Sequence, residues 1–183
     1  MKRVVLVAAA VTASLLGSLP GAYAAPASSP ADGPAPATAA LRQYYPDVDY
    51  ITCEINKERD NSGLPRLAIS ERANDAARRH AQDMANMGKL TATGSDGRRQ
   101  RDRLNDAGIF SNYIAEYMFS GYSHDGAFAD MATDPRPNNG FYRALMSRDI
   151  VALGIGYDRT FWDVNLLGYH RRLVTRPAVC TQG

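Results

Sequence analysis

The chain has 183 residues and a nearly balanced charge, with 21 lysine and arginine side chains against 19 aspartates and glutamates. Its basic residues form one local run, and a nucleic-acid surface would need more such clustering together with aromatic platforms. The composition therefore argues against a nucleic-acid partner, and we interpret the run as a solvated loop and helix edge. The run consists of Arg98, Arg99, Arg101 and Arg103.

The first 24 residues are typical of an export signal. Lys2 and Arg3 precede the apolar stretch "VVLVAAAVTASLLG", and "AYA" before Ala25 has the small residues that signal peptidase accepts. The stretch is short for a membrane span, and glycine and proline interrupt it near its end. We therefore predict a signal peptide over residues 1–24, no stable membrane span after its cleavage, and secretion to the extracellular side.

Residues 25–40, "APASSPADGPAPATAA", are rich in proline, alanine and serine and carry a single charge. Such a composition buries too little apolar surface to offset the entropy of ordering the chain, so we expect a disordered linker. The remaining residues 41–183 are predicted to form one domain, since roughly 140 residues is an ordinary domain length.

Cys53 and Cys180 are the two cysteines of the chain, one near each end of the predicted domain. In an oxidising compartment an even pair favours a disulfide, whereas zinc needs more ligands than two distant thiols supply. A catalytic thiol is the alternative, and it would need a free state and a nearby histidine. We expect a Cys53–Cys180 disulfide, which would stabilise the domain by roughly 4–5 kcal/mol through closure of a long loop.

Helices dominate the first half of the domain. Apolar spacing predicts a helix from Asp49, its expected cap, to Gly63, followed by an extended linker, "LPRLAIS". A long alanine-rich helix is predicted from Ser70 to Gly88, and a short one follows over residues 101–108. His80 lies at the edge of the apolar stripe of the long helix, where a lone histidine is more often a packed core residue than a ligand.

Strands are expected in the second half. "NYIAEYMF" has the aromatic and branched content of a strand, and a turn with His124 leads to a helix that we expect Ser123 or Asp125 to cap. After another short helix at "FYRALMS", the segments "VALGIGYD" and "FWDVNLLGY" predict a hairpin with a tight turn at Asp158–Thr160. The order of elements indicates an α+β domain with helices packed against a small antiparallel sheet.

Four of these segments resemble motifs of the CAP superfamily, which comprises cysteine-rich secretory proteins, antigen 5 and pathogenesis-related 1 proteins. "INKERDNSGLPRL" resembles the family's opening motif, and "RANDAARRHAQDMANMGKL" is similar to its alanine-rich second helix. "ALGIGYD" and "FWDVNLLG" resemble its closing strands. The resemblance extends from Tyr50 to about Tyr169 and implies the α-β-α sandwich of that family.

The family's cleft usually carries two histidines and two acids, a set that can hold a divalent cation near neutral pH. Matched to that pattern, Ala92 stands at the first histidine and Phe141 at the second, whereas Glu116 and Asp134 retain the acids. The resemblance therefore implies a ligand-binding cleft formed by Glu116, Asp134, Phe141 and Ala92 in which both imidazoles are lost. We expect no metal, no cofactor and no catalytic residue there.

Three functions stay open at this point. The first is a secreted binding domain without a functional zinc site, whose partner is a lipid- or sterol-like hydrophobic molecule, a cell surface or a protein. Aromatic residues cluster in the second half of the domain and suit an apolar ligand. The second is a secreted hydrolase that uses Glu116 with Asp134 or His124. The third is a ligand-free extracellular scaffold module. We favour the first and interpret His124 as an incidental turn residue.

Overall fold

The computed structural model describes residues 44–181, so the predicted signal peptide (1–24) and linker (25–40) lie outside the described residues. The helices are α1 (Val48–Asn61), α2 (Glu71–Met87), α3 (Gln100–Asp106), α4 (Asp125–Ala132) and α5 (Gly140–Leu145). The strands are β1 (Ala68–Ile69), β2 (Ile114–Ser120), β3 (Ala152–Asp158) and β4 (Phe161–Leu167). None of the helices within residues 44–181 is long and apolar enough to span a bilayer.

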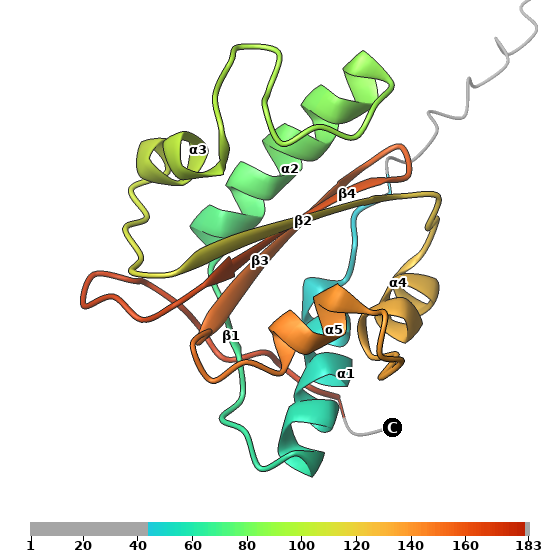
Figure 1. The fold of residues 1–183 in the computed structure, drawn as a ribbon, viewed down its shortest axis with the longest axis vertical. Coiled ribbons are helices and arrows are strands. Elements are labelled where there is room, and N and C mark those ends of the chain that lie inside the picture. Colours follow the sequence, from blue (N-terminus) through green and yellow to red (C-terminus); the bar gives the residue numbers. More distant parts are fainter. Residues whose placement is uncertain (1–43, 182–183) are drawn as a thin grey trace, which may run out of the picture. The chain divides into compact units, whose positions relative to one another are not determined.

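The elements form three layers (Figure 1). Helices α2 and α3 cover one face of the sheet, and α1, α4 and α5 cover the other. This arrangement confirms the α-β-α sandwich that the family resemblance implied. The strand order is β1-β3-β4-β2, with antiparallel pairs β3–β4 and β4–β2 as expected. The structure adds a short parallel edge, because Ala68 and Ile69, within the segment predicted as a linker, pair with Ala152 and Leu153.

Capping residues set the ends of the helices. Asp47 caps α1, since its carboxylate accepts the backbone N–H of Tyr50 at 2.9 Å, so the prediction that Asp49 is the cap is wrong. Ser70 caps α2, and Gly88 ends it in the left-handed conformation with φ 66°, both as predicted.

The face of the sheet beneath α2 admits only very small side chains on β3. A Cβ atom added to Gly154 would lie 2.3 Å from Cβ of Ala73, and one added to Gly156 would lie 2.1 Å from the backbone nitrogen of Arg78. Both neighbours belong to α2, so the helix and the strand are in backbone contact. The alanine stripe of α2 has the same cause, because Ala73 and Ala77 leave room for the strand.

The opposite face carries the larger apolar core. Trp162 of β4 is fully buried, stacks on Phe128 of α4 with ring centroids 4.1 Å apart, and donates its indole N–H to the carbonyl of Tyr122 at 2.8 Å. Phe141 of α5 belongs to the same core and is 3 % exposed. Most of the aromatic residues that cluster in the second half of the sequence therefore belong to the hydrophobic core.

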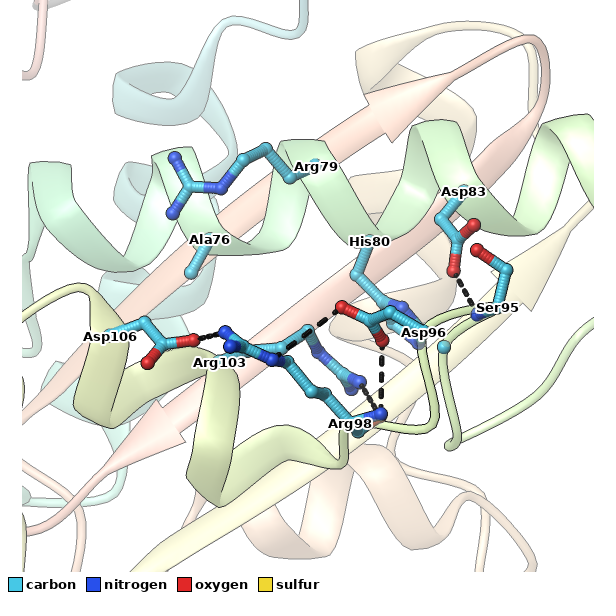
Figure 2. A pocket seen from close by; sticks show the side chains of 10 residues that line it. Ala76, Arg79, His80, Asp83, Ser95, Asp96, Arg98, Arg103 and Asp106 are labelled. Carbon is cyan, nitrogen blue, oxygen red and sulfur yellow. Dashed lines mark hydrogen bonds and ion pairs between the residues drawn. The ribbon is translucent and has the colours of Figure 1, made fainter.

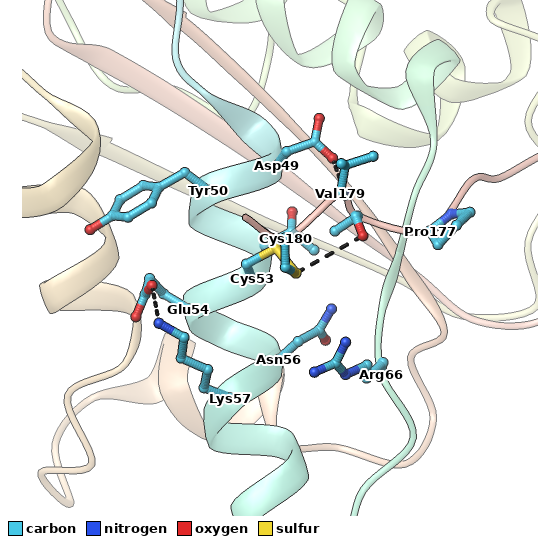
Figure 3. The surroundings of a disulfide bond; sticks show 12 residues. Asp49, Tyr50, Cys53, Glu54, Asn56, Lys57, Arg66, Pro177, Val179 and Cys180 are labelled. Atoms are coloured by element: carbon cyan, nitrogen blue, oxygen red, sulfur yellow. Dashed lines mark hydrogen bonds and ion pairs between the residues drawn. A yellow bond between two sulfur atoms is a disulfide. The ribbon is translucent and has the colours of Figure 1, made fainter. Parts of the chain in front are cut away.

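The C-terminal segment returns to α1, where it is fixed covalently and by charge (Figure 3). Cys53 and Cys180 form the predicted disulfide, with Cα atoms 5.6 Å apart. Asp49 accepts two hydrogen bonds from the guanidinium of Arg176, at 2.6 and 2.8 Å, and a third from the backbone of Val179 at 2.7 Å. Asp49 thus anchors this segment.

Replacing Gly156 by alanine should be severely destabilising, since its Cβ would meet the α2 backbone and not the end of a flexible side chain. We expect the free energy of unfolding, measured by urea denaturation, to fall by about 3 kcal/mol, the upper range for overpacking. Gly126→Ala is the matched control, because an added Cβ there makes only ordinary contacts of 3.6 Å. Equal stability of the two variants would contradict the backbone contact.

The double variant Cys53→Ser/Cys180→Ser should lose up to roughly 4–5 kcal/mol of stability, because the bridge closes a loop of 127 residues in sequence. Non-reducing mass spectrometry of the exported wild-type protein should find no free thiol. Two free thiols in that sample would contradict the disulfide, whatever the stability of the variant.

Candidate binding site

Glu116 lies in the middle of β2, opposite Asn165 of β4, on the face of the sheet that α2 and α3 cover. Its carboxylate accepts a hydrogen bond at 2.5 Å from the guanidinium of Arg103, which reaches down from α3. The Glu116 side chain is 7 % exposed and that of Arg103 is 13 % exposed. The interpretation of the basic run as solvated is therefore wrong for Arg103, because α3 turns this side chain toward the sheet.

Arg103 also holds the loop between α2 and α3. Its guanidinium donates to the carbonyl oxygen of Arg98 at 2.7 Å and to that of Ala92 at 3.3 Å. Ala92 is itself exposed. The structure thus brings together Ala92 and Glu116, two of the four residues predicted to form the cleft, through the side chain of Arg103.

A second acid, Asp163 of β4, lies beside Glu116 and is fully buried. Oδ1 of Asp163 has no hydrogen-bond partner among the described residues. Burial, followed by the negative charge of Glu116, raises the pKa of Asp163 well above its usual range. Burial also raises the pKa of Glu116, although Arg103 opposes the shift.

Amide side chains complete this network. Gln100 of α3 donates to the side-chain oxygen of Asn165 at 2.9 Å and to the carbonyl of Ala115 at 2.8 Å. Asn165 in turn donates to Oδ2 of Asp163 at 3.0 Å. The strand sequence "FWDVNLL" contained a signal for this, since two polar residues alternate with apolar ones in a strand that is buried on both faces.

The other two predicted cleft residues lie in the opposite layer. Phe141 packs its ring 5.0 Å from that of Tyr117, which neighbours Glu116 in β2 and so points to the other face of the sheet. Asp134 follows α4 and hydrogen-bonds to the guanidinium of Arg136 at 2.5 Å. The structure does not bring either residue to Glu116.

His124 does not approach Glu116 either. It is exposed and caps α4, with its Nδ1 accepting the backbone N–H of Ala127 at 3.2 Å. Neither Ser123 nor Asp125 provides this cap, contrary to our expectation. The role of His124 is therefore local and structural, as its interpretation as a turn residue implied.

The side chains around Glu116 do not fit the divalent cation that the family resemblance implies. Ala92 has no donor side chain, and the guanidinium of Arg103 already places a positive charge against the Glu116 carboxylate. Within residues 44–181, no group of three or more histidine, cysteine, aspartate and glutamate side chains could hold a metal ion. We derive no metal chemistry for this site.

Beside the network lies a cavity of about 320 Å³ between α2, α3 and the loop that joins them (Figure 2). His80 lines it, 1 % exposed, with Nε2 at 2.8 Å from the carbonyl oxygen of Thr91. Burial and the nearby charge of Arg103 lower the pKa of His80. The sequence pattern identified His80 as packed but gave no sign of the cavity, because Thr91 is eleven residues away in a loop. The cavity is lined by Ala76, Arg79, His80, Asp83, Gly94, Ser95, Asp96, Arg98, Arg103 and Asp106.

Asp163→Asn should change how stability depends on pH. Because the folded-state pKa of Asp163 is raised, the folded protein keeps a proton that the unfolded chain releases above about pH 4. The wild-type free energy of unfolding should therefore fall as the pH rises from about 4 through the folded-state pKa. The asparagine variant keeps the shape of the side chain and an oxygen that can accept from Asn165, so it should lack most of this fall and be the more stable protein at neutral pH.

Urea denaturation at a series of pH values between about 4 and 8 measures this difference. Asp134→Asn is the control, since the hydrogen bonds from Arg136 lower the pKa of Asp134, so its contribution is lost only below about pH 4 and its curve should run parallel to that of the wild type over this range. Parallel curves for the wild type and Asp163→Asn would contradict the raised pKa of Asp163.

The known proteins that this chain resembles are similar to it in fold. An extracellular SCP-domain protein from Bacillus anthracis str. Ames is 21 % identical with a TM-score of 0.58, over 66 % of this chain and 39 % of that one. An outer surface protein from Borrelia burgdorferi is 18 % identical with a TM-score of 0.59, over 70 % of this chain and 98 % of that one. A cysteine-rich secretory protein from Staphylococcus aureus subsp. aureus Mu50 is 12 % identical with a TM-score of 0.54, over 66 % of this chain and 37 % of that one.

This chain thus spans well under two thirds of the Bacillus and Staphylococcus proteins, and at these identities the similarity shows the fold alone. No curated protein matches the sequence significantly. Residues 53–166, more than half of the chain, match the family model "CAP: Cysteine-rich secretory protein family". The chain therefore belongs to the cysteine-rich secretory protein (CAP) family.

Proposed function

We propose that this chain is an exported CAP domain that acts by binding a ligand or partner and not by catalysis. One observation carries the proposal: Arg103 lies against Glu116 and Ala92, the two residues that the family resemblance matches to cation-ligand positions. A carboxylate bound by a guanidinium at 2.5 Å is neither a free metal ligand nor a free base.

Export is supported by the disulfide, which needs an oxidising compartment, and by the export signal in the sequence. Two of the structural neighbours are described as an extracellular protein and an outer surface protein. These observations are consistent with an extracellular binding role.

The observed burial bears on the class of ligand. Phe141, which suggested an apolar cleft in place of the family's second histidine, is 3 % exposed and belongs to the core. The cavity beside Arg103 is lined mainly by charged side chains. We therefore propose a polar ligand in preference to the lipid- or sterol-like molecule that the aromatic content favoured.

A hydrolase that pairs Glu116 with Asp134 or His124 has little support. Asp134 lies in the opposite layer beside Arg136, and His124 caps α4. Neither of the two partners expected for this hydrolase is therefore positioned to act with Glu116.

Zinc or calcium should leave the melting temperature of the mature protein unchanged. A metal present at 100 times its Kd would add about 2.7 kcal/mol to the free energy of unfolding, a shift easily seen by differential scanning calorimetry. Glu116→Gln is the control, since it removes the charge that a cation would need. An increase seen in the wild type and absent from Glu116→Gln would overturn the proposal.

A further inference from the structure

The cavity between α2, α3 and their connecting loop has the size of a small-ligand site, at the lower end of the range of about 300–1,000 Å³ for such sites. None of the four predicted cleft residues lines it. We propose that this cavity binds a small carboxylate that also carries hydroxyl or ammonium donors, the chemistry of a sugar acid or a free amino acid. The inference rests on the proposed function, in which the domain binds without a metal.

Arg79 provides the charge for the carboxylate. Its guanidinium is exposed at the cavity and has no ion-pair or hydrogen-bond partner among residues 44–181. The other two arginines of the cavity are engaged: Arg98 pairs with Asp96 and Asp106, and Arg103 pairs with Glu116. Because a planar guanidinium can donate two parallel hydrogen bonds to a carboxylate, Arg79 is the group in this cavity that is free to bind one.

His80 provides an acceptor that lacks a donor. Its Nε2 faces the carbonyl oxygen of Thr91, which can only accept, so the hydrogen of the neutral ring is on Nε2. The ring Nδ1 is therefore an acceptor, and it is buried without a partner among the described residues. A hydroxyl or ammonium group of a ligand in the cavity would supply the missing hydrogen bond.

Asp83 also favours a ligand that carries hydrogen-bond donors. Although burial opposes it, hydrogen bonds from the side chain and backbone of Ser95 lower the pKa of Asp83, so the carboxylate is ionised. An ionised carboxylate repels anions and accepts hydrogen bonds from hydroxyl and ammonium groups.

Figure 2 shows how the cavity divides. Asp83 and Ser95 lie toward one end, Arg79 extends along α2 toward the other, and His80 extends from α2 toward Asp96. A ligand with its negative charge at one end and its donors at the other complements this arrangement. A simple anion without donors satisfies only the arginine.

Isothermal titration of the mature protein with four probes tests the proposal. Glucuronate and serine represent the two sources of the proposed chemistry, acetate lacks the donors, and glucose lacks the carboxylate. We expect glucuronate or serine to bind at least tenfold more tightly than acetate and glucose. The Nδ1 resonance of His80, observed by nitrogen-15 NMR, should shift on addition of the ligand that binds.

Arg79→Ala should weaken that binding at least tenfold and leave the melting temperature unchanged, since Arg79 is exposed and has no partner to lose among the described residues. Arg78→Ala is the matched control on the same helix, because Arg78 pairs with Asp75 and does not line the cavity. The proposal is overturned if neither glucuronate nor serine binds at tens of millimolar, or if Arg79→Ala binds as well as Arg78→Ala.

Titrations run in EDTA and in zinc separate the two proposals. Binding that requires zinc would overturn the proposed metal-independent function together with this inference. Absence of binding in both conditions would overturn the inference alone.

Discussion

The contact between the backbones of α2 and β3 is the constraint on which the rest of this face depends. Gly154 and Gly156 bring the helix so close to the strand that no side chain fits between them. The helix is thereby fixed over β3, and β4 and β2 extend beyond it on the same face. That remaining area must be covered by α3 and the loop before it, whose inward side chains include the polar residues Gln100 and Arg103. The polar network thus lies between the sheet and the part of this cover that α3 provides.

Burying the two carboxyl groups of Glu116 and Asp163 side by side is electrostatically unfavourable, and two features of the chain reduce this cost. Arg103 supplies one positive charge, and a retained proton removes the second negative charge. A buried ion pair adds little net stability by itself, because desolvation offsets the attraction. Its effect here is to fix one arrangement of α3 and the loop against the sheet.

The sequence predicted what depends on local chemistry. Ser70, Gly88 and the turn at Asp158–Thr160 act as predicted, and the cysteine pair followed from the inferred compartment. The predictions that were wrong concern residues whose roles depend on contacts between distant segments. Asp49 looked like a cap because nothing in its neighbourhood indicates Arg176, which is 127 residues away. Arg103 looked solvated because its neighbours in the run are, and its partner lies on a strand thirteen residues later. Aligning Phe141 with a cleft residue assumed an orientation that only the packing of α5 decides.

Arg103 also connects the network to the cavity. It binds Glu116 beneath, lines the cavity at its side, and holds the loop that closes the cavity through the carbonyls of Ala92 and Arg98. Burial is the larger cause of the lowered pKa of His80, and the charge of Arg103 lowers it further. A neutral His80 leaves Nδ1 free to accept a hydrogen bond. Arg103 therefore acts both on Glu116 in the network and, through its charge, on the pKa of His80 in the cavity.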